Sequence, residues 1–362
     1  MKRSRRRRPV KPGLLQRIRD YFRGLKARRE ENARKRYKKK IARRHHRDSI
    51  RREKKMQAAL RKAEKARPER SLFNFISLPS FNRSAVFQFV NSLTLFILSY
   101  VLIYLLYQII VILTAGLWEL DSVLYYYDLA FNDFSPKWTR FNIIVITISG
   151  PVVCLAVGIL LYFKVFSMNR VRGYTRLFVL WLSFHAINHF LGALVSGIST
   201  DEGFGYVVNW LYVITFFKLL LALLALFMLG IIGYFSAGRF LETGMAAGKT
   251  SPNENRAMIL RQAIIPWILG SLLIILVKIP NNFNFPYETI MFATMGFLLV
   301  PMYFNRDAAP RSWILKNYRQ RHSFRWLFFL LMLAFLSFFR IELDRGLHFD
   351  ISIDISFSIK RA

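Results

Sequence analysis

The chain has 362 residues, of which 54% are hydrophobic, and it carries a formal net charge of +33 at pH 7. An ordinary soluble domain does not combine so much apolar surface with so much charge, so the two properties must occupy separate segments. Residues 1–70 hold 31 Lys and Arg against 7 Asp and Glu, a net +24, whereas residues 71–362 hold 23 against 14, a net +9. The sequence therefore predicts a basic arm, residues 1–84, followed by a membrane-embedded body.

The arm begins with a segment, residues 13–26, whose apolar residues recur at helical spacing among basic ones. This pattern predicts an amphipathic helix able to lie on an anionic membrane surface. Residues 30–66 lack an apolar stripe, and both a solvated helix and a disordered tail fit them. Clustered Lys and Arg suit phosphates, so we expect contacts with anionic lipid or with RNA, including the ribosome. The residues expected to make them are Arg17, Arg19, Arg23, Lys26, Arg36, Lys38, Lys39 and Lys40.

Residues 85–341 alternate long apolar runs with short polar connections. A helix needs about 20 apolar residues to cross the hydrocarbon core of a bilayer. A membrane-spanning segment must also satisfy its own backbone hydrogen bonds, so the runs predict an all-α bundle of about seven transmembrane helices. The runs lie at 86–114, 142–166, 177–197, 207–235, 262–279, 286–304 and 324–340.

The loop charges predict how this bundle sits in its membrane. The loops at 167–176 and 305–325 are basic, like the arm, whereas the loops at 115–141 and 198–206 are mainly acidic. Lys and Arg accumulate in cytoplasmic loops. We therefore expect a cytoplasmic N-terminus and an extracytoplasmic C-terminus. We expect the cytoplasmic (inner) membrane of a bacterium, because no organellar targeting pattern or cleavable signal is legible. The mixture of aromatic residues and acids in 115–141 is typical of an interfacial segment.

The third apolar run, WLSFHAINHFLGALVSG at 181–197, contains two histidines four residues apart. Residues at that spacing share one face of a helix. Ionisable groups at such depth normally face a bundle interior or water, and a short loop makes the third and fourth runs antiparallel neighbours. We expect a candidate polar pocket between them, unless the same side chains serve only as hydrogen-bonded helix packing. Its residues are His185, Asn188, His189, Asn209 and Lys218.

The segment HAINHFLGALVSG at 185–197 resembles the first motif of the site-2 (M50-type) intramembrane metalloproteases, whose two histidines bind zinc. The resemblance covers 13 residues. Ala186 stands where the family has the glutamate that serves as general base, and the last four runs contain no aspartate to supply the third ligand. The resemblance therefore implies at most a degenerate relative. We expect no metal, no other cofactor and no enzymatic activity.

The tail, residues 342–362, contains the alternating segment FDISIDISFSI at 349–359. Strict alternation over eleven residues predicts a strand with one apolar face. A lone strand is unstable in water, and no partner strand is evident elsewhere in the chain, so we expect it to pair with another protein or with a second copy of itself. The apolar face consists of Phe349, Ile351, Ile353, Ile355, Phe357 and Ile359.

Three functional hypotheses follow from these features. The arm and the tail are both binding segments, which favours a non-enzymatic, multi-pass membrane component of a larger protein assembly. The first alternative is a small-molecule or proton transporter that uses the polar pocket between the third and fourth runs. The second alternative is a degenerate protein that resembles an intramembrane metalloprotease.

Overall fold

The computed structural model describes residues 83–167, 173–244, 252–279, 286–305 and 323–351. The chain separates into two units, Met1–Ile76 and Ser77–Ala362, and all the described residues belong to the second. The predicted helix at 13–26 and the eight basic residues expected to contact phosphates lie outside the described residues. Lipid or RNA binding by the arm therefore stays a prediction.

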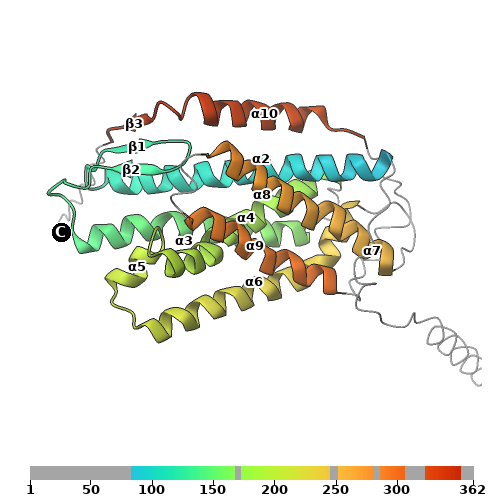
Figure 1. The fold of residues 1–362 in the computed structure, drawn as a ribbon, viewed down its shortest axis with the longest axis horizontal. Coiled ribbons are helices and arrows are strands. Elements are labelled where there is room, and N and C mark those ends of the chain that lie inside the picture. Colours follow the sequence, from blue (N-terminus) through green and yellow to red (C-terminus); the bar gives the residue numbers. More distant parts are fainter. Residues whose placement is uncertain (1–82, 168–172, 245–251, 280–285, 306–322, 352–362) are drawn as a thin grey trace, which may run out of the picture. The chain divides into compact units, whose positions relative to one another are not determined.

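The described residues form a bundle of apolar helices (Figure 1), which confirms the predicted all-α membrane fold. Six helical segments within them are long and apolar enough to cross a bilayer. A seventh apolar helix, α10, has 16 residues and contacts α2. The six are α2 (Arg83–Gly116), α3 (Arg140–Ser167), α4 (Tyr174–Thr200), α6 (Thr215–Gly244), the continuous segment of α7 (Pro252–Ile259), η2 (Leu260–Ile264) and α8 (Ile265–Val277), and α9 (Tyr287–Phe304); α10 is Trp326–Ile341.

Two helix starts differ from the sequence prediction. The fourth run was expected to begin at residue 207, but a separate short helix, α5 (Gly205–Trp210), precedes α6. Tyr212 has a positive φ of 53° between them, a conformation that a continuous helix does not allow. The fifth run was expected to begin at 262, but α7 already begins at Pro252. Proline is favoured in the first turn of a helix, where its missing N–H costs nothing.

A π-helical turn at Leu260–Ile264 links α7 to α8. It precedes Pro266, which has no N–H to donate to the carbonyl of Gln262. The hydroxyl of Ser92 on α2 donates to that carbonyl instead, at 2.5 Å, and the indole of Trp181 on α4 donates to the Ser92 oxygen at 3.1 Å. The break in one helix is thus satisfied by two neighbouring helices, which fixes α2, α4 and α8 against one another.

One end of the bundle carries a small sheet in the order β2-β1-β3, with both pairings antiparallel. Its strands are β1 (Ser122–Leu124), β2 (Leu129–Phe131) and β3 (Leu347–Phe349). Phe349, the first residue of the predicted tail strand, lies opposite Ser122 of β1. Phe349 and Ile351 both pack against the hydrophobic core of this chain. The start of the tail therefore has a partner within the chain, which the sequence did not reveal.

The remaining apolar tail residues, Ile353, Ile355, Phe357 and Ile359, lie outside the described residues. Pairing of that part of the tail with another protein or a second copy stays a prediction. The backbone approach at the described end is close: a Cβ added to Gly116, at the end of α2, would lie 2.9 Å from the carbonyl oxygen of Ile351.

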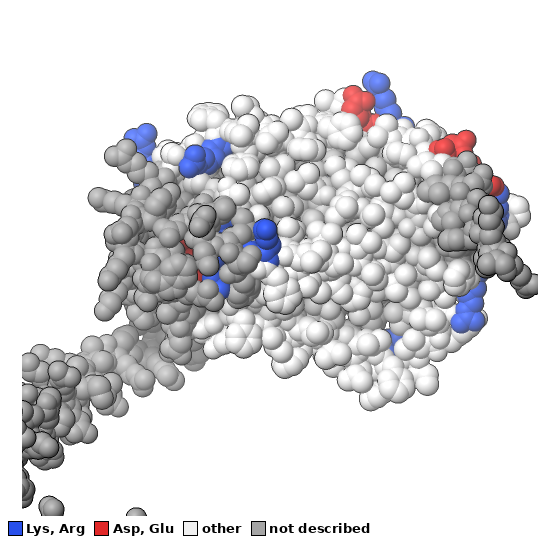
Figure 2. All heavy atoms as spheres, turned by 180° about the vertical axis from the view of Figure 1, so that it is seen from behind, with Lys and Arg blue, Asp and Glu red and all other residues white. Residues whose placement is uncertain are grey.

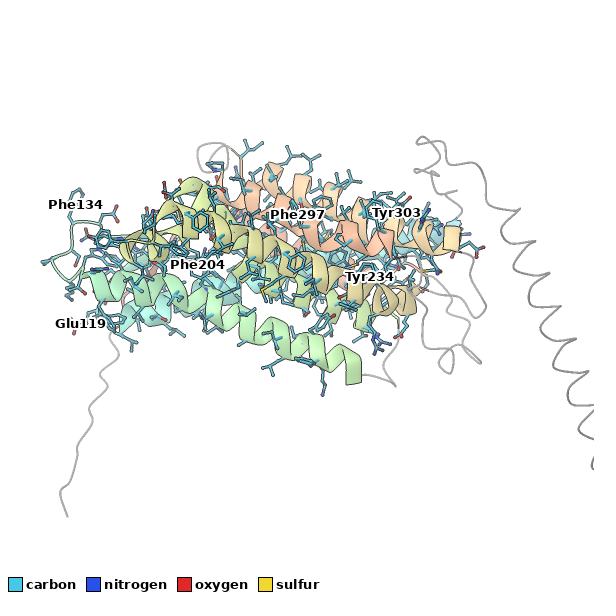
Figure 3. All side chains as sticks on the ribbon, turned by 90° about the horizontal axis from the view of Figure 1, so that it is seen from below. Glu119, Phe134, Phe204, Tyr234, Phe297 and Tyr303 are labelled. Carbon is cyan, nitrogen blue, oxygen red and sulfur yellow. The ribbon has the colours of Figure 1, made fainter. Side chains whose placement is uncertain are left out.

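The helices divide into a buried centre and an apolar exterior. Of the most apolar stretch in α4, 72% is buried, against 17% in α6. Figure 2 shows a wide uncharged band on one face of the molecule, with charged side chains near its two ends. Glu119 and Phe134 lie at the sheet end, and Tyr303 lies toward the opposite end (Figure 3). Such a band is what a bilayer requires of a spanning bundle, so the chain is a multi-pass membrane protein.

Candidate ligand pocket at the sheet end of the bundle

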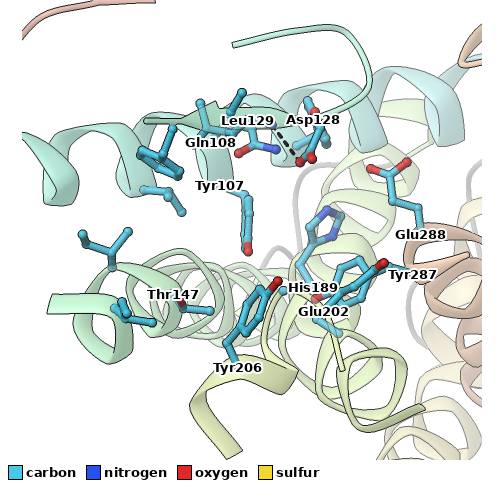
Figure 4. Close-up of a pocket in the computed structure, with 18 of the residues that line it drawn as sticks. Tyr107, Gln108, Asp128, Leu129, Thr147, His189, Glu202, Tyr206, Tyr287 and Glu288 are labelled. Carbon is cyan, nitrogen blue, oxygen red and sulfur yellow. Dashed lines mark hydrogen bonds between the residues drawn. The ribbon is translucent and has the colours of Figure 1, made fainter. Parts of the chain in front are cut away.

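A pocket of about 710 Å³ lies at the sheet end of the bundle. Strand β2, five helices and the connections between them supply its walls, and Figure 4 shows part of this lining. Tyr107 comes from α2, Thr147 from α3, His189 from α4, Tyr206 from α5 and Glu288 from the first turn of α9. We call this space the sheet-end pocket.

The lining of the sheet-end pocket is acidic and aromatic. Of the residues that the structure describes, four carboxylate residues line it and no Lys or Arg does. The acids are Asp128, Asp133, Glu202 and Glu288, and the tyrosines and tryptophans are Tyr104, Tyr107, Tyr127, Tyr206, Tyr287, Trp138 and Trp210. A space of this kind has a negative potential and offers the electron-rich faces of several rings.

The charge of Glu288 is compensated by Lys278, which follows α8. The Lys278 ammonium lies 2.6 Å and 2.8 Å from the two carboxylate oxygens of Glu288 and 4.0 Å from the ring centre of Tyr104. Tyr100 also donates to Glu288, at 3.3 Å. Lys278 is buried, at 1% exposure. Its charge is thus paired with Glu288 and acts on Asp128 only from a greater distance.

Asp128 and Glu202 carry the charge that Lys278 does not offset. Neither forms an ion pair with any residue in the described ranges. Asp128 accepts a hydrogen bond from the N–H of Leu129 at 2.8 Å. Although Asp128 as a residue is exposed, desolvation by the surrounding protein, helped by Glu288 and Glu202, raises the pKa of its carboxyl to about 6. The N–H of Leu129 and the charge of Lys278 act in the opposite direction. Burial also raises the pKa of Glu202. Asp128 is therefore mainly ionised at pH 7 and half protonated near pH 6.

His189 places a free hydrogen-bond acceptor at the wall of the pocket. Its Nδ1 lies 2.8 Å from the carbonyl oxygen of His185, one turn earlier in α4. A carbonyl oxygen only accepts, so this bond assigns the proton of the neutral ring to Nδ1 and leaves a lone pair on Nε2. Nε2 is buried and has no hydrogen-bond partner among the described residues, and the whole residue is 4% exposed. Buried polar atoms normally have partners, so an unpaired one on a residue that lines a pocket is a candidate contact for a ligand or an ordered water.

The other two polar residues expected on α4 lie elsewhere. His185 is surrounded by the rings of Phe96, Tyr100 and Trp181, with centroids 4.6 to 6.3 Å away, and does not line the pocket. Asn188 donates to the carbonyl of Met291 at 2.7 Å and accepts from Thr294 at 3.1 Å. Asn188 thus joins α4 to α9, in the manner of interhelical packing.

Asn209 and Lys218 form a separate polar chain. Lys218 donates to the side-chain oxygen of Asn209, whose amide donates to Asp201 at 2.8 Å. Neither residue lines the sheet-end pocket. Of the five residues expected to share a polar pocket, the structure places only His189 in this one.

Sequence reasoning missed the acids and tyrosines that surround His189. The signal was present in LYYYDLAF at 124–131, where three tyrosines precede Asp128. We interpreted the mixture of aromatic residues and acids as contact with the membrane interface. The turn between β1 and β2 instead brings Tyr127 and Asp128 to the pocket.

Within the described ranges, no three His, Cys, Asp or Glu side chains are grouped closely enough to hold a metal ion. The acids of the pocket are therefore dispersed around a larger space. No protein family, curated protein or solved structure matches the chain. The fold and the pocket define a helical-bundle membrane protein with an acidic, aromatic pocket at one end.

Proposed function

We propose that this membrane protein binds a small molecule in the sheet-end pocket. The observation that carries the proposal is the buried, unpaired Nε2 of His189 on the wall of a space of about 710 Å³. Ligand pockets are typically a few hundred to 1,000 Å³ and combine apolar walls with a few convergent polar groups. A non-catalytic receptor or the binding step of a transporter both fit, and we place the binding role first because it needs nothing beyond the pocket itself.

The proposal places the pocket on the extracytoplasmic face of a bacterial cytoplasmic membrane. Support comes from the loop charges. The loop at 167–176 holds three Arg and no acid, whereas the loop at 198–206, at the sheet end, holds Asp201 and Glu202 and no Lys or Arg. Basic residues at membrane-helix ends favour the cytoplasmic side. A role in a larger assembly remains a prediction, because the arm and most of the tail lie outside the described residues.

The orientation is tested by reporter fusions in bacteria. An enzyme active only in the cytoplasm is expected to be active when fused after residue 172 or 315, and inactive when fused after residue 202. The reason is the basic charge of the first two loops and the acidic charge of the third. Activity at 202 with none at 172 would reverse the proposed orientation.

Ligand binding is tested by filling the pocket. Ile143 lines it from α3, whereas Ile159 on the same helix is 41% exposed and does not line it. The full chain in mild detergent is screened by thermal unfolding against anionic, neutral and cationic small molecules. A compound that binds the folded state raises the midpoint in proportion to the logarithm of its concentration.

We expect Ile143→Trp to abolish the shift produced by any such compound and Ile159→Trp to leave it unchanged. The tryptophan in the first variant occupies the space that the ligand needs, and in the second it faces outward. A shift that survives in Ile143→Trp would show that the compound binds elsewhere. A wild-type chain that responds to no compound would overturn the proposed function.

A further inference from the structure

The electrostatics of the sheet-end pocket select the sign of the ligand's charge. Four carboxylates line the pocket, and within the described ranges only Glu288 has a cationic partner, Lys278, which is buried against Glu288 and Tyr104. A bound anion would meet uncompensated repulsion in a partly dehydrated space. A bound cation would instead supply Asp128 and Glu202 with a positive charge close by and would be attracted to both carboxylates.

The aromatic walls indicate the chemical type of that cation. Tyr107 and Tyr206 face the pocket from different helices, and Tyr127 and Tyr287 add rings from a turn and from α9. Aromatic faces attract organic cations through the ring quadrupole, and they also accept an alkyl body. The carboxylates are too dispersed to ligate a bare metal ion, so the lining suits a larger, polyatomic cation.

His189 adds a requirement for a hydrogen-bond donor. Nδ1 already donates to the carbonyl of His185, so the neutral ring presents only an acceptor, Nε2. In Figure 4 the ring projects from α4 into the space between Asp128 and Glu288. A primary or secondary ammonium, an amidinium or a guanidinium can donate an N–H to Nε2, whereas a quaternary ammonium cannot.

We propose that the sheet-end pocket binds a small organic cation that carries at least one N–H group, with its charge near Asp128 and an N–H directed at His189 Nε2. This inference rests on the proposed binding function and adds the class of ligand. The acidic cluster supplies attraction, the tyrosines supply contact with the alkyl part, and His189 distinguishes N–H cations from quaternary ones.

The test measures the affinity of three probes for the full chain in detergent at pH 7.5. The probes are n-butylammonium, tetramethylammonium and butyrate, and the readout is the concentration dependence of the thermal unfolding midpoint. We expect n-butylammonium to bind most tightly, tetramethylammonium to bind more weakly and butyrate to produce no shift. An affinity for butyrate equal to that for n-butylammonium would overturn the inference.

Two variants separate the roles of charge and hydrogen bond. Asp128→Asn should lower the affinity for both n-butylammonium and tetramethylammonium, because it removes a negative charge that attracts both cations. His189→Phe should lower the affinity for n-butylammonium by about tenfold and leave the affinity for tetramethylammonium nearly unchanged, because only n-butylammonium loses a charge-assisted hydrogen bond. Glu119→Gln is the control, because Glu119 pairs with Lys137 outside the pocket, and should change neither affinity.

A pH titration gives a readout that a purely structural role would not move. The pKa of Asp128 is about 6, so n-butylammonium affinity should fall between pH 7.5 and pH 5 as Asp128 takes up a proton. Glu202, Glu288 with Lys278, and His189 face the same space from other elements, and protonation of Glu202, whose pKa is raised by burial, adds to the fall. The fall should be smaller in Asp128→Asn. An equal fall of affinity in Asp128→Asn would show that Asp128 does not contribute to cation binding.

The possible failures of the two proposals are distinguishable. If anionic or neutral compounds bind and Ile143→Trp blocks them, the binding function stands and the cation class is wrong. If n-butylammonium binds with the same affinity to His189→Phe as to the wild-type chain, the ligand is a cation but the requirement for an N–H group is wrong. If no compound binds, both proposals fail together.

Discussion

Replacing Glu288 by glutamine is expected to lower the free energy of unfolding by about 3 to 5 kcal/mol, because it leaves the Lys278 ammonium buried without its counter-charge. Lys278 is 1% exposed and its two carboxylate contacts are at 2.6 and 2.8 Å. The ring of Tyr104 at 4.0 Å attracts the ammonium but does not replace a negative charge. The measurement is reversible unfolding of the chain in mixed micelles, titrated with a denaturing detergent.

A double variant distinguishes this explanation from a simple packing defect. Lys278→Met with Glu288→Gln removes both charges and keeps similar side-chain volumes, so it should recover most of the lost stability. The matched control is Lys137→Met, which breaks the pair of Lys137 with Glu119. Those side chains are 46% and 60% exposed, and a solvated pair contributes about 0 to 1 kcal/mol. A double variant no more stable than Glu288→Gln would contradict the argument.

The bundle could be predicted from sequence because membrane helices obey a strong local rule. A segment in hydrocarbon must satisfy its backbone by itself, so hydropathy alone locates α2, α3, α4 and α9 to within a few residues. The rule loses force where a helix leaves the apolar layer. Hydropathy does not register the polar start of α7, and it joins residues 207–214 to α6 although Tyr212 interrupts the helix.

The candidate site was less predictable, because it is assembled from residues distant in sequence. His189 was identified from its unusual depth in an apolar run. Its neighbours Asp128 and Glu288 lie some 60 residues before and 100 residues after it, and nothing local indicates that they converge. Asn209 and Lys218 were grouped with His189 because short loops make neighbours of successive helices. In the structure Asn209 instead bonds to Asp201, and Lys218 bonds to Asn209.

The tail illustrates the same limit for strands. Alternation predicted a strand over 349–359, but β3 ends at Phe349, and residues 350 and 351 do not continue it. Its partners β1 and β2 are only three residues long and lie among aromatic residues that carry no alternating pattern. Strand pairing depends on which edges meet in space. A partner strand of three residues, more than 220 positions away, leaves no periodic signal in the sequence.

A second large effect is expected where α6 and α9 meet. The two helices approach so closely at Gly233 that a Cβ added there would lie 1.7 Å from the carbonyl oxygen of Leu298. The obstacle is backbone, which cannot turn aside as a flexible side chain can. Gly233→Ala must therefore push α6 away from α9. Overpacking of this kind costs about 1 to 3 kcal/mol, and in membranes it also removes a close contact of the sort that small residues provide.

Gly230, one turn earlier on α6, supplies the control for this prediction. A Cβ there would meet its nearest atoms, in Phe297 and Pro301, at 3.8 and 3.9 Å, which is ordinary van der Waals contact. Gly230→Ala should thus be neutral, or stabilising by up to about 1 kcal/mol, because alanine loses less conformational entropy than glycine when the helix forms. In mixed micelles, the free energy of unfolding should fall in Gly233→Ala and stay the same or rise in Gly230→Ala, although the two identical substitutions are three residues apart. Equal effects at both positions would mean that helix propensity, and not the contact with Leu298, controls the stability of α6.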